Sequence, residues 1–412
     1  MAKFSRRDTA FRSWLACPKR AAGIFTRPAD ATDTWLNRPG AGGNAMTKRP
    51  ISADSHVTEP PNCFIDHIEP AFRDRAPRMT RDPVKGDMYV VPGMATTIPV
   101  SLSSGAGRPA EELSTTGARF EELHQGGWDA KARLADQDRD GVAAELIYPS
   151  VGMVLCNHED LDYKRACMVA YNRWLQGFCE SAPGRVFGLG QTAVRTVAEG
   201  IEDLRAIKAM GFKGAMLPGF PGEEDYDSRI YDPFWEAAID LGLPLSFHIL
   251  TSKTDGLGKP RGPKINAFLS IIRGNQDILG MLVFAGVFMR HPKLKVVCAE
   301  ADAGWAPHYM YRMDHAYKRH RHWLKGNELE KMPSDYFREN IFMTFQDDFT
   351  AFQFANHVNH ERLMWASDFP HSDSTWPDSQ KVIAEQTSHL SADVRDRILY
   401  DNVAELYGIS LQ

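Results

Sequence analysis

The sequence predicts an α/β fold, a distorted (β/α)8 TIM barrel with a long insertion after its first strand. Eight short apolar segments recur along the chain, and segments with helical patterns separate most of them. Apolar strands that alternate with helices are typical of parallel strands buried on both faces, and eight in alternation favour a closed barrel. A doubly wound open sheet is the alternative, but it normally carries a Gly-rich loop after its first strand, where this chain has ADSHVTEP (53–60).

The predicted strands follow one another in regular alternation with helices. The strands are 51–56, 142–150, 186–191, 212–219, 244–250, 294–300, 341–346 and 363–368. Helical patterns precede them over 128–141, 161–181, 197–210, 233–242, 275–292, from 305 onward and over 349–360. Gly242 is the expected C-cap of the 233–242 helix, because glycine takes the left-handed conformation that ends many helices.

One segment interrupts the alternation. Residues 60–128 are rich in Pro, Gly, Ser and Thr and include MYVVPG and TTIPVSL, which predict a small hairpin. A long loop at a barrel mouth can act as a lid or bring residues from a partner subunit. A disordered excursion is the alternative. The barrel itself is expected over 50–410.

The first 49 residues differ in composition from the rest, with ten Lys or Arg and three Asp. We expect a disordered basic extension here, with a true start of translation near Met46. The Asp residues argue against a transit peptide.

Whole-chain composition excludes several classes of partner. The chain is 43% hydrophobic and 25% charged with a net charge of −5, so no overall basic field favours nucleic acid. No apolar run reaches the length of a membrane-spanning helix. The six cysteines form no CxxC pair, which favours a reducing, cytoplasmic location.

Ionisable residues gather where four predicted strands end. Asp54 and His56 end the first strand, His248 ends the fifth and Asp368 ends the eighth. Residues i and i+2 of a strand point to the same side, so Asp54 and His56 can face the barrel axis together. The further members of this set are Glu59, Glu300 with Asp302, and His371.

This set predicts a metal site, although each member alone could be a strand cap or a satisfied core residue. Carboxylates gathered in one cleft repel one another, and their burial is costly. A bound divalent cation removes that cost. The mixture of imidazole and carboxylate suits zinc first, with iron or manganese as alternatives, and one or two ions per chain are open.

Several stretches of the chain match the pattern of a known family. They are ADSHVTEP, GWDAKARLADQDRDGV, SFHI, HPKLKVVCAEADAGWAPHYMYRMD, WASDFPHSDSTWP and DNVAELYG. Together, over about 50–410, they resemble the amidohydrolase-related (amidohydrolase 2) family of metal-dependent hydrolases, in the branch of the aminocarboxymuconate-semialdehyde decarboxylase relatives. The resemblance implies a distorted TIM barrel and a metal held by Asp54, His56, His248 and Asp368.

Two departures from the family pattern bear on function. Better-known members have HxH or ExH on the first strand, where this chain has Asp54-Ser-His56. Decarboxylases of the branch have a His at the end of the sixth strand, as the expected catalytic base, and here Glu300 stands in its place. That loss weakens a decarboxylase interpretation. Glu59, Glu300 and His371 could instead supply a second metal site.

The first functional hypothesis is a metal-dependent hydrolase in which metal-activated water attacks an amide, ester or related carbonyl. Asp368 would bind the metal and take the proton of the water, and Glu300 or His371 would ligate a second metal or carry the proton to the leaving group. The alternative is a non-oxidative decarboxylase of an aromatic or unsaturated acid. A metal-binding barrel without catalysis and an oxygen-activating di-iron site are further interpretations.

The partners expected from the sequence are a small-molecule substrate and a second copy of the chain. Trp305 and His308 begin the helix after the sixth strand and are candidate substrate-binding residues. The aromatic residues Trp128, Phe369 and Trp376 suggest a flat or apolar substrate, although aromatic side chains also fill cores. The long insertion and the resemblance favour a homodimer.

Other polar residues are expected to be structural. Arg312 and Asp314 are predicted to form an ion pair, and the basic run 317–323 is expected to be a solvated helix face. Asn402 is expected to cap a helix. His291, before the sixth strand, is expected to be structural at the opposite end of the barrel.

Overall fold

The computed structural model describes residues 48–95, 97–252 and 261–411. The chain divides into two compact units, Met1–Ala41 and Gly42–Gln412, and all the described residues belong to the second. Of the predicted basic extension, residues 1–47, including the expected start at Met46, lie outside the described residues.

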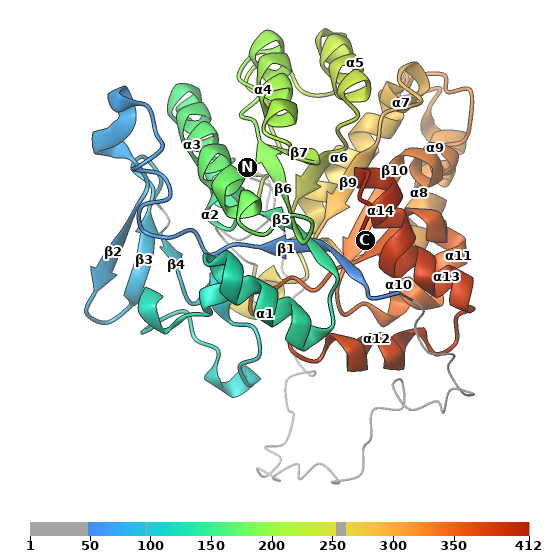
Figure 1. Ribbon diagram of the computed structural model, residues 1–412. Helices are drawn as coiled ribbons and strands as arrows, with labels where there is room; N and C mark the ends of the chain where they lie inside the picture. Colours follow the sequence, from blue (N-terminus) through green and yellow to red (C-terminus); the bar gives the residue numbers. More distant parts are fainter. Residues whose placement is uncertain (1–47, 96, 253–260, 412) are drawn as a thin grey trace, which may run out of the picture. The chain divides into compact units, whose positions relative to one another are not determined.

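Eight parallel strands form a nearly closed barrel, with helices around it (Figure 1). They are β1 (Ile51–His56), β5 (Ala144–Tyr148), β6 (Val186–Gln191), β7 (Gly214–Leu217), β8 (Leu245–His248), β9 (Val296–Ala299), β10 (Ile341–Phe345) and β11 (Leu363–Trp365). They are ordered along the sheet as along the chain, and every neighbouring pair is parallel. The predicted (β/α)8 barrel and all eight of its strands are confirmed.

Hydrogen bonds between β1 and the segment that follows β11 join the two ends of the sheet. The Asp368 amide donates to Asp54 O over 3.0 Å, and the His56 amide donates to Phe369 O over 2.7 Å. The Ser367 amide donates to Ser52 Oγ over 2.8 Å. Closure therefore brings the residues after the last strand directly beside those that end the first.

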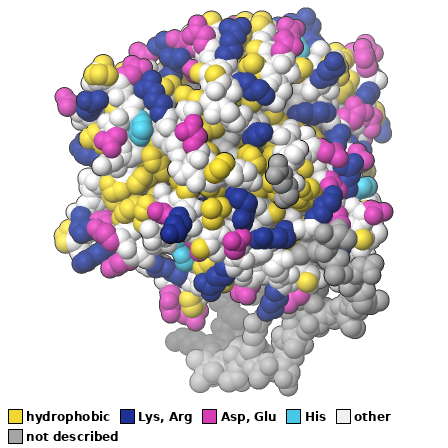
Figure 2. All heavy atoms as spheres, viewed as in Figure 1, with side chains coloured by type: hydrophobic (Ala, Val, Ile, Leu, Met, Phe, Trp, Pro, Cys, Tyr) yellow, Lys and Arg dark blue, Asp and Glu magenta, His cyan; other side chains and the backbone are white. Residues whose placement is uncertain are grey.

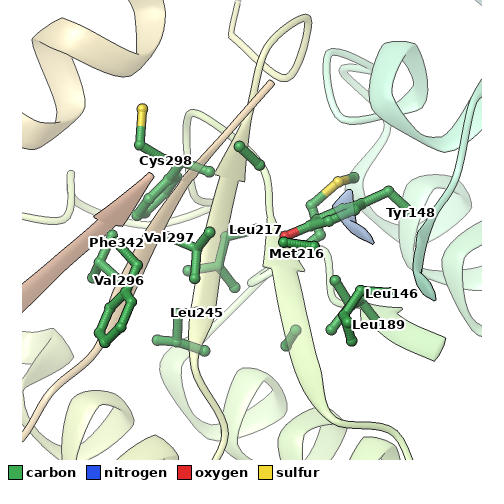
Figure 3. Close-up of a cluster of buried hydrophobic side chains, with 14 of the residues drawn as sticks. Leu146, Tyr148, Leu189, Met216, Leu217, Leu245, Val296, Val297, Cys298 and Phe342 are labelled. Atoms are coloured by element: carbon green, nitrogen blue, oxygen red, sulfur yellow. The ribbon is translucent and has the colours of Figure 1, made fainter. Parts of the chain in front are cut away.

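The barrel core is apolar, because the strand residues are buried on both faces. Figure 3 shows Leu146 and Tyr148 of β5 close to Leu189 and Met216 of the next two strands. Leu217, Leu245, Val296, Val297, Cys298 and Phe342 continue this cluster across the later strands. This packed core fixes the strand ends, and the polar residues that follow them emerge at one end of the barrel.

The helices are α1 (Ala130–Asp140), α2 (Val151–Leu155), α3 (Leu161–Glu180), α4 (Val197–Ala209), α5 (Asp232–Leu241), α6 (Arg273–Phe284), α7 (Val287–Arg290), α8 (Ala306–His320), α9 (Pro333–Asn340), α10 (Phe349–Gln353), α11 (Ala355–Val358), α12 (Ser379–Thr387), α13 (Ala392–Asp396) and α14 (Asn402–Tyr407). Gly242 ends α5 with φ 62°, as predicted. The helix expected over 275–292 is broken, because Gly286 has φ 71° between α6 and α7. The segment 349–360 is likewise split, into α10 and α11.

The insertion holds a three-stranded antiparallel sheet, seen in blue to cyan in Figure 1. Its strands are β2 (Arg78–Asp82), β3 (Gly86–Val90) and β4 (Ile98–Pro99). The predicted hairpin corresponds to β3 and β4, and β2 adds a strand that the sequence pattern did not reveal. The insertion then returns to the barrel mouth, where the Ala106 amide donates to Pro370 O over 3.1 Å. Ala106 also forms a small buried cluster with Phe369 and Trp376.

Two of the structural assignments made from the sequence are wrong. Asp314 does not pair with Arg312, because residues i and i+2 of a helix do not face each other. Its carboxylate instead accepts two hydrogen bonds of 2.9 Å from the amide and hydroxyl of Ser334, at the start of α9. Asn402 does not N-cap α14, of which it is the first residue, and its Nδ2 donates to the carbonyls of His360, before β11, and Leu363, the first residue of β11.

His291 is structural, as expected, with its Nε2 2.9 Å from Asp232 Oδ1. Lys318 and Arg319 of the basic run are exposed, which agrees with a solvated helix face.

Charges of both signs are interspersed on the face of the molecule shown in Figure 2, where no large basic area is visible. Within the described ranges, none of the helices is both long and apolar enough to cross a membrane.

Candidate metal centre

Six of the sequence-predicted site residues meet at the carboxyl end of the barrel. Asp54, His56, His248 and Glu300 form one group whose potential ligand atoms all lie within 4.8 Å of one another. A second such group consists of His56, Glu300, Asp368 and His371. These six residues, called the candidate centre below, come from the ends of β1, β8, β9 and β11.

His56 Nε2 lies at the middle of the candidate centre. It is 3.4 Å from Asp54 Oδ1, 3.1 Å from Glu300 Oε2 and 3.5 Å from Asp368 Oδ1. His248 Nε2 is 3.1 Å from the same Glu300 oxygen and 3.6 Å from Asp54 Oδ1. The donor atoms of three carboxylates and two imidazoles thus converge on one small volume.

Several of these atoms are buried without a hydrogen-bond partner. They are Asp54 Oδ1, His248 Nε2 and both carboxylate oxygens of Asp368. Unpartnered buried polar atoms are rare and costly in proteins. Here they all border the candidate centre, so a divalent cation bound among them would satisfy them together, and the residues present fit such an ion.

The two central imidazoles are oriented by backbone carbonyl groups. His56 Nδ1 lies 3.0 Å from Pro149 O, and His248 Nδ1 lies 3.0 Å from Ile249 O. A carbonyl only accepts, so each Nδ1 carries a proton, and Nε2 is the ring nitrogen left to bind a cation at the candidate centre. This is the tautomer that a metal-binding histidine requires at Nε2.

His371 approaches the candidate centre from the side of Asp368. Its Nδ1 is 3.0 Å from Asp368 Oδ1 and 4.0 Å from Glu300 Oε2. Its ring stacks on that of His56 with centroids 3.8 Å apart. Its Nε2 lies 2.8 Å from Ser150 Oγ, outside the cluster of carboxylates.

Strong electrostatic coupling marks the candidate centre. Burial opposes protonation of His248, but the carboxylates of Asp54 and Glu300 outweigh it and raise its pKa to about 10. Burial, together with the charges of Glu300 and Asp54, raises the pKa of Asp368 well above its usual range. Burial and the neighbouring His56 lower the pKa of His371 well below its usual range. Strongly shifted groups that share one site are typical of functional sites.

The backbone is strained where the candidate ligands leave the strands. Glu300 has φ 50° and Asp368 has φ 55°, and Leu250, two residues after His248, has φ 65°. Non-glycine residues with positive φ are uncommon, and they cluster at functional sites where the surrounding structure holds them.

Two polar residues that the sequence interpretation missed support the candidate centre. Thr344 of β10 donates a hydrogen bond of 2.8 Å from Oγ1 to Asp54 Oδ2 and accepts one of 2.9 Å from the Glu300 amide. Arg133 of α1 is fully buried and donates from Nη1 to His56 O over 2.8 Å. Thr344 is the one polar side chain in the strand IFMTF, a signal that could have found it, whereas Arg133 follows the ordinary pattern of a helix.

Three predicted site residues lie outside the candidate centre. Glu59 turns away, and its Oε1 accepts hydrogen bonds from the amides of Ser150 (3.0 Å) and Val151 (2.9 Å). Trp305 donates from Nε1 to Ala301 O over 2.7 Å and packs on aromatic neighbours. His308 is exposed on α8. The structure therefore does not bring Glu59 among the candidate metal ligands.

A cavity of about 520 Å³ is lined by the chain that follows His371, and none of the six residues of the candidate centre lines it. Arg108 and the neighbouring residues Gly107 and Pro109 of the insertion line one side of it, and the loop from Ser372 to Asp378 lines another. The insertion thus borders a cavity together with the loop that follows His371.

Comparison with known proteins identifies the family. A family profile described as Amidohydrolase matches residues 54–409. The gamma-resorcylate decarboxylase of Rhizobium sp. (strain MTP-10005) is 25% identical over 219 residues, which are 47% of this chain and 62% of that protein. The chain therefore spans less than two thirds of the length of this curated relative.

Solved structures share the fold. An amidohydrolase from Mycobacterium avium subsp. paratuberculosis K-10 superposes with a TM-score of 0.73 at 21% identity, over 88% of this chain and 100% of that one. The 5-carboxyvanillate decarboxylase from Novosphingobium aromaticivorans DSM 12444, complexed with manganese and 4-hydroxy-3-methoxy-5-nitrobenzoic acid, superposes with a TM-score of 0.63 at 20% identity, over 88% and 96%.

Proposed function

The chain belongs to the amidohydrolase family, and from that premise we propose that it is a metal-dependent carboxy-lyase that releases CO2 from a small aromatic acid. The named relative acts as a decarboxylase, and the manganese-bound structural neighbour is named as one too. The observation that carries the proposal is the buried set of converging, unpartnered ligand atoms beside His371. A homodimer and a cytoplasmic location stay predictions from the sequence.

The ligand geometry favours one ion per chain. Both groups of candidate ligands include His56, whose Nδ1 is committed to Pro149 O. Its single remaining lone pair, on Nε2, can bind only one ion. Three carboxylates with two imidazoles suit manganese, with zinc as the alternative.

For decarboxylation, the site must bind the acid, stabilise the electron pair that remains on the ring carbon and supply a proton. When bound, the divalent ion supplies the Lewis acidity that holds the carboxylate and an adjacent hydroxyl of the substrate. The bond from the ring carbon to the carboxylate breaks, CO2 leaves, and the electron pair stays on the ring carbon. That carbon then takes one proton.

The proton has a candidate source in the pair formed by Asp368 and His371. Asp368 Oδ1 and His371 Nδ1 are 3.0 Å apart. Burial raises the pKa of the Asp368 carboxyl and lowers that of the His371 ring. Such a pair can deliver a proton to the vacated carbon and be recharged from solvent.

Hydrolysis is the second candidate, and Glu300 is the observation that favours it. The decarboxylases that the sequence resembles carry a His at this position. Glu300 Oε2 lies 3.1 Å from both His56 and His248 Nε2, where a carboxylate can hold a water molecule and accept its proton. Asp368 and His371 would then carry that proton to the leaving group of an ester or amide.

The test compares CO2 release with hydrolysis in the same preparation. Residues 46–412, loaded with manganese or zinc, are incubated with hydroxylated benzoic acids and, separately, with aryl esters and anilides. We expect CO2 release and, in D2O, one deuterium at the vacated ring carbon. With saturating metal, His371→Asn should slow deuterium incorporation, and Asp368→Asn should fail to bind the metal. Ester or anilide cleavage without CO2 release from any acid would replace the proposal by the hydrolase.

A further inference from the structure

Ser150 lies two residues after β5 and immediately before α2, with its hydroxyl between two partners. Its Oγ is 2.6 Å from Val57 O and 2.8 Å from His371 Nε2. A serine hydroxyl has one proton, and Val57 O can only accept a hydrogen bond. The proton of Ser150 is therefore committed to Val57, and Ser150 Oγ must act as the acceptor for His371.

This assignment fixes the proton on the histidine ring. His371 can donate to Ser150 Oγ only if its Nε2 carries a proton. The lone pair of a neutral His371 then lies on Nδ1, which is 3.0 Å from Asp368 Oδ1 and 4.0 Å from Glu300 Oε2. Ser150 thus directs the accepting nitrogen of His371 into the candidate centre.

Glu59 in turn fixes Ser150. The buried Glu59 side chain accepts hydrogen bonds from the amides of both Ser150 and Val151. Its own backbone carbonyl accepts a hydrogen bond of 2.6 Å from the hydroxyl of Tyr89, in the sheet of the insertion. The turn that presents the Ser150 hydroxyl is consequently held from two elements.

We infer that Ser150 is a positioning residue that holds His371 in the Nε2–H tautomer, and that Glu59 fixes Ser150 for this purpose. The inference deepens the proposed function and rests on the candidate centre. It assigns Glu59, which the sequence suggested as a metal ligand, to the support of a histidine instead. The merely structural alternative is that Ser150 only ties the start of α2 to β1 through Val57.

The first measurement is the tautomer itself. In zinc-loaded protein labelled with ¹⁵N at histidine rings, the His371 signals are identified by their loss in His371→Asn. We expect an Nε2–H ring in the wild-type protein and in Ser150→Thr, which keeps the hydroxyl. We expect a mixture of tautomers, or a swap to Nδ1–H, in Ser150→Ala.

The second measurement is zinc affinity, because His371 contacts the candidate ligand Asp368, and loss of support for a metal ligand typically weakens binding about 10- to 100-fold. Ser150→Ala should show this loss, and Ser150→Thr should recover most of it. Ser246→Ala is the matched control, since Ser246 is equally buried but its Oγ pairs with Tyr148 at 2.8 Å. Adding Glu59→Ala to Ser150→Ala should cause no further loss of zinc affinity, because Glu59 acts on His371 only through Ser150.

An unchanged Nε2–H signal in Ser150→Ala would overturn the inference, as would equal losses of zinc affinity in Ser150→Ala and Ser246→Ala. Neither measurement uses a substrate. A failure to release CO2 from any acid would therefore count against the carboxy-lyase while leaving the role of Ser150 to these two tests.

Discussion

The Thr344 hydroxyl donates a hydrogen bond of 2.8 Å to Asp54 Oδ2, which leaves Asp54 Oδ1 as the oxygen that faces the candidate centre. The same hydroxyl oxygen accepts a hydrogen bond of 2.9 Å from the Glu300 amide. One side chain on β10 thus orients candidate ligands on both β1 and β9. Partners of this kind are the groups that set the direction of a metal ligand.

Thr344→Val should therefore weaken metal binding about 10- to 100-fold. Valine has nearly the same shape but cannot orient Asp54 or accept from the Glu300 amide, which would be left without this partner at a cost of about 1–3 kcal/mol. Zinc affinity is measured by competition with a chromophoric chelator. Thr344→Ser is the control that keeps the hydroxyl. Equal affinities in the wild-type protein and the valine variant would show that Asp54 needs no such support.

Metal affinity should rise with pH over the neutral range. Asp54 and Glu300 raise the pKa of His248 to about 10 against the effect of burial. Below that pH the ring carries a proton that an incoming cation must displace. Each displaced proton makes the apparent affinity change about tenfold per pH unit. The measurement is zinc or manganese affinity at several values between pH 6 and pH 9. A flat profile would mean that His248 binds no metal.

The sequence predicted the barrel well, because its main signal is local. A strand buried on both faces is a continuous apolar run, and all eight such runs formed strands. Asp54 and His56 were predictable as a pair for the same reason, since positions i and i+2 of a strand share a side. Ligand candidates that stand at a strand end, such as His248, follow from the topology of a parallel barrel.

Not every residue beyond a strand end could be placed in this way. Glu59 lies only three residues after His56, yet the chain turns there and its carboxylate meets the start of α2. No periodicity encodes the path of such a turn. Arg133 has the pattern of a solvated helix residue but is fully buried. Its partners include the carbonyls of His56 and Phe369, which are distant in sequence, so only the fold could reveal its role.

Arg133→Ala should be strongly destabilising and should also weaken metal binding. The guanidinium pairs with Glu145 Oε2 at 2.5 Å and donates to His56 O and, over 3.3 Å, to Phe369 O. Removing one member of a fully buried ion pair costs about 3–5 kcal/mol. The two carbonyls belong to the segments that end β1 and β11, so the candidate ligands beside them would shift.

Urea unfolding of Arg133→Ala with and without zinc provides the measurement. Arg165→Ala is the matched control: its ion pair with Asp203, at 2.7 Å, is partly exposed and far along the chain from the candidate ligands. We expect a loss of about 1 kcal/mol or less there and no change in zinc affinity. Equal losses of stability in the two variants would contradict the supporting role of Arg133.

The unfolding free energy of Glu59→Gln, taken relative to that of the wild-type protein, should be higher at pH 8 than at pH 4. Burial raises the pKa of Glu59 to about 7 from its ordinary 4.5, against the opposing effect of the amides that it binds. For an acid whose folded pKa is raised, the folded state holds the proton more tightly than the unfolded state. The wild-type protein therefore loses stability as pH rises from about 4.5 to 7, by up to about 3 kcal/mol.

Glutamine keeps an oxygen for the amides of Ser150 and Val151 but cannot ionise. The difference in unfolding free energy between variant and wild type should grow from pH 4.5 to pH 7 and stay constant above, whatever fixed offset the new amide adds. The variant should also retain its bound zinc, because Glu59 lies outside the candidate centre. If Glu59→Gln loses zinc and shows no such pH-dependent gain, Glu59 is an ionised metal ligand and its contact with Ser150 is secondary.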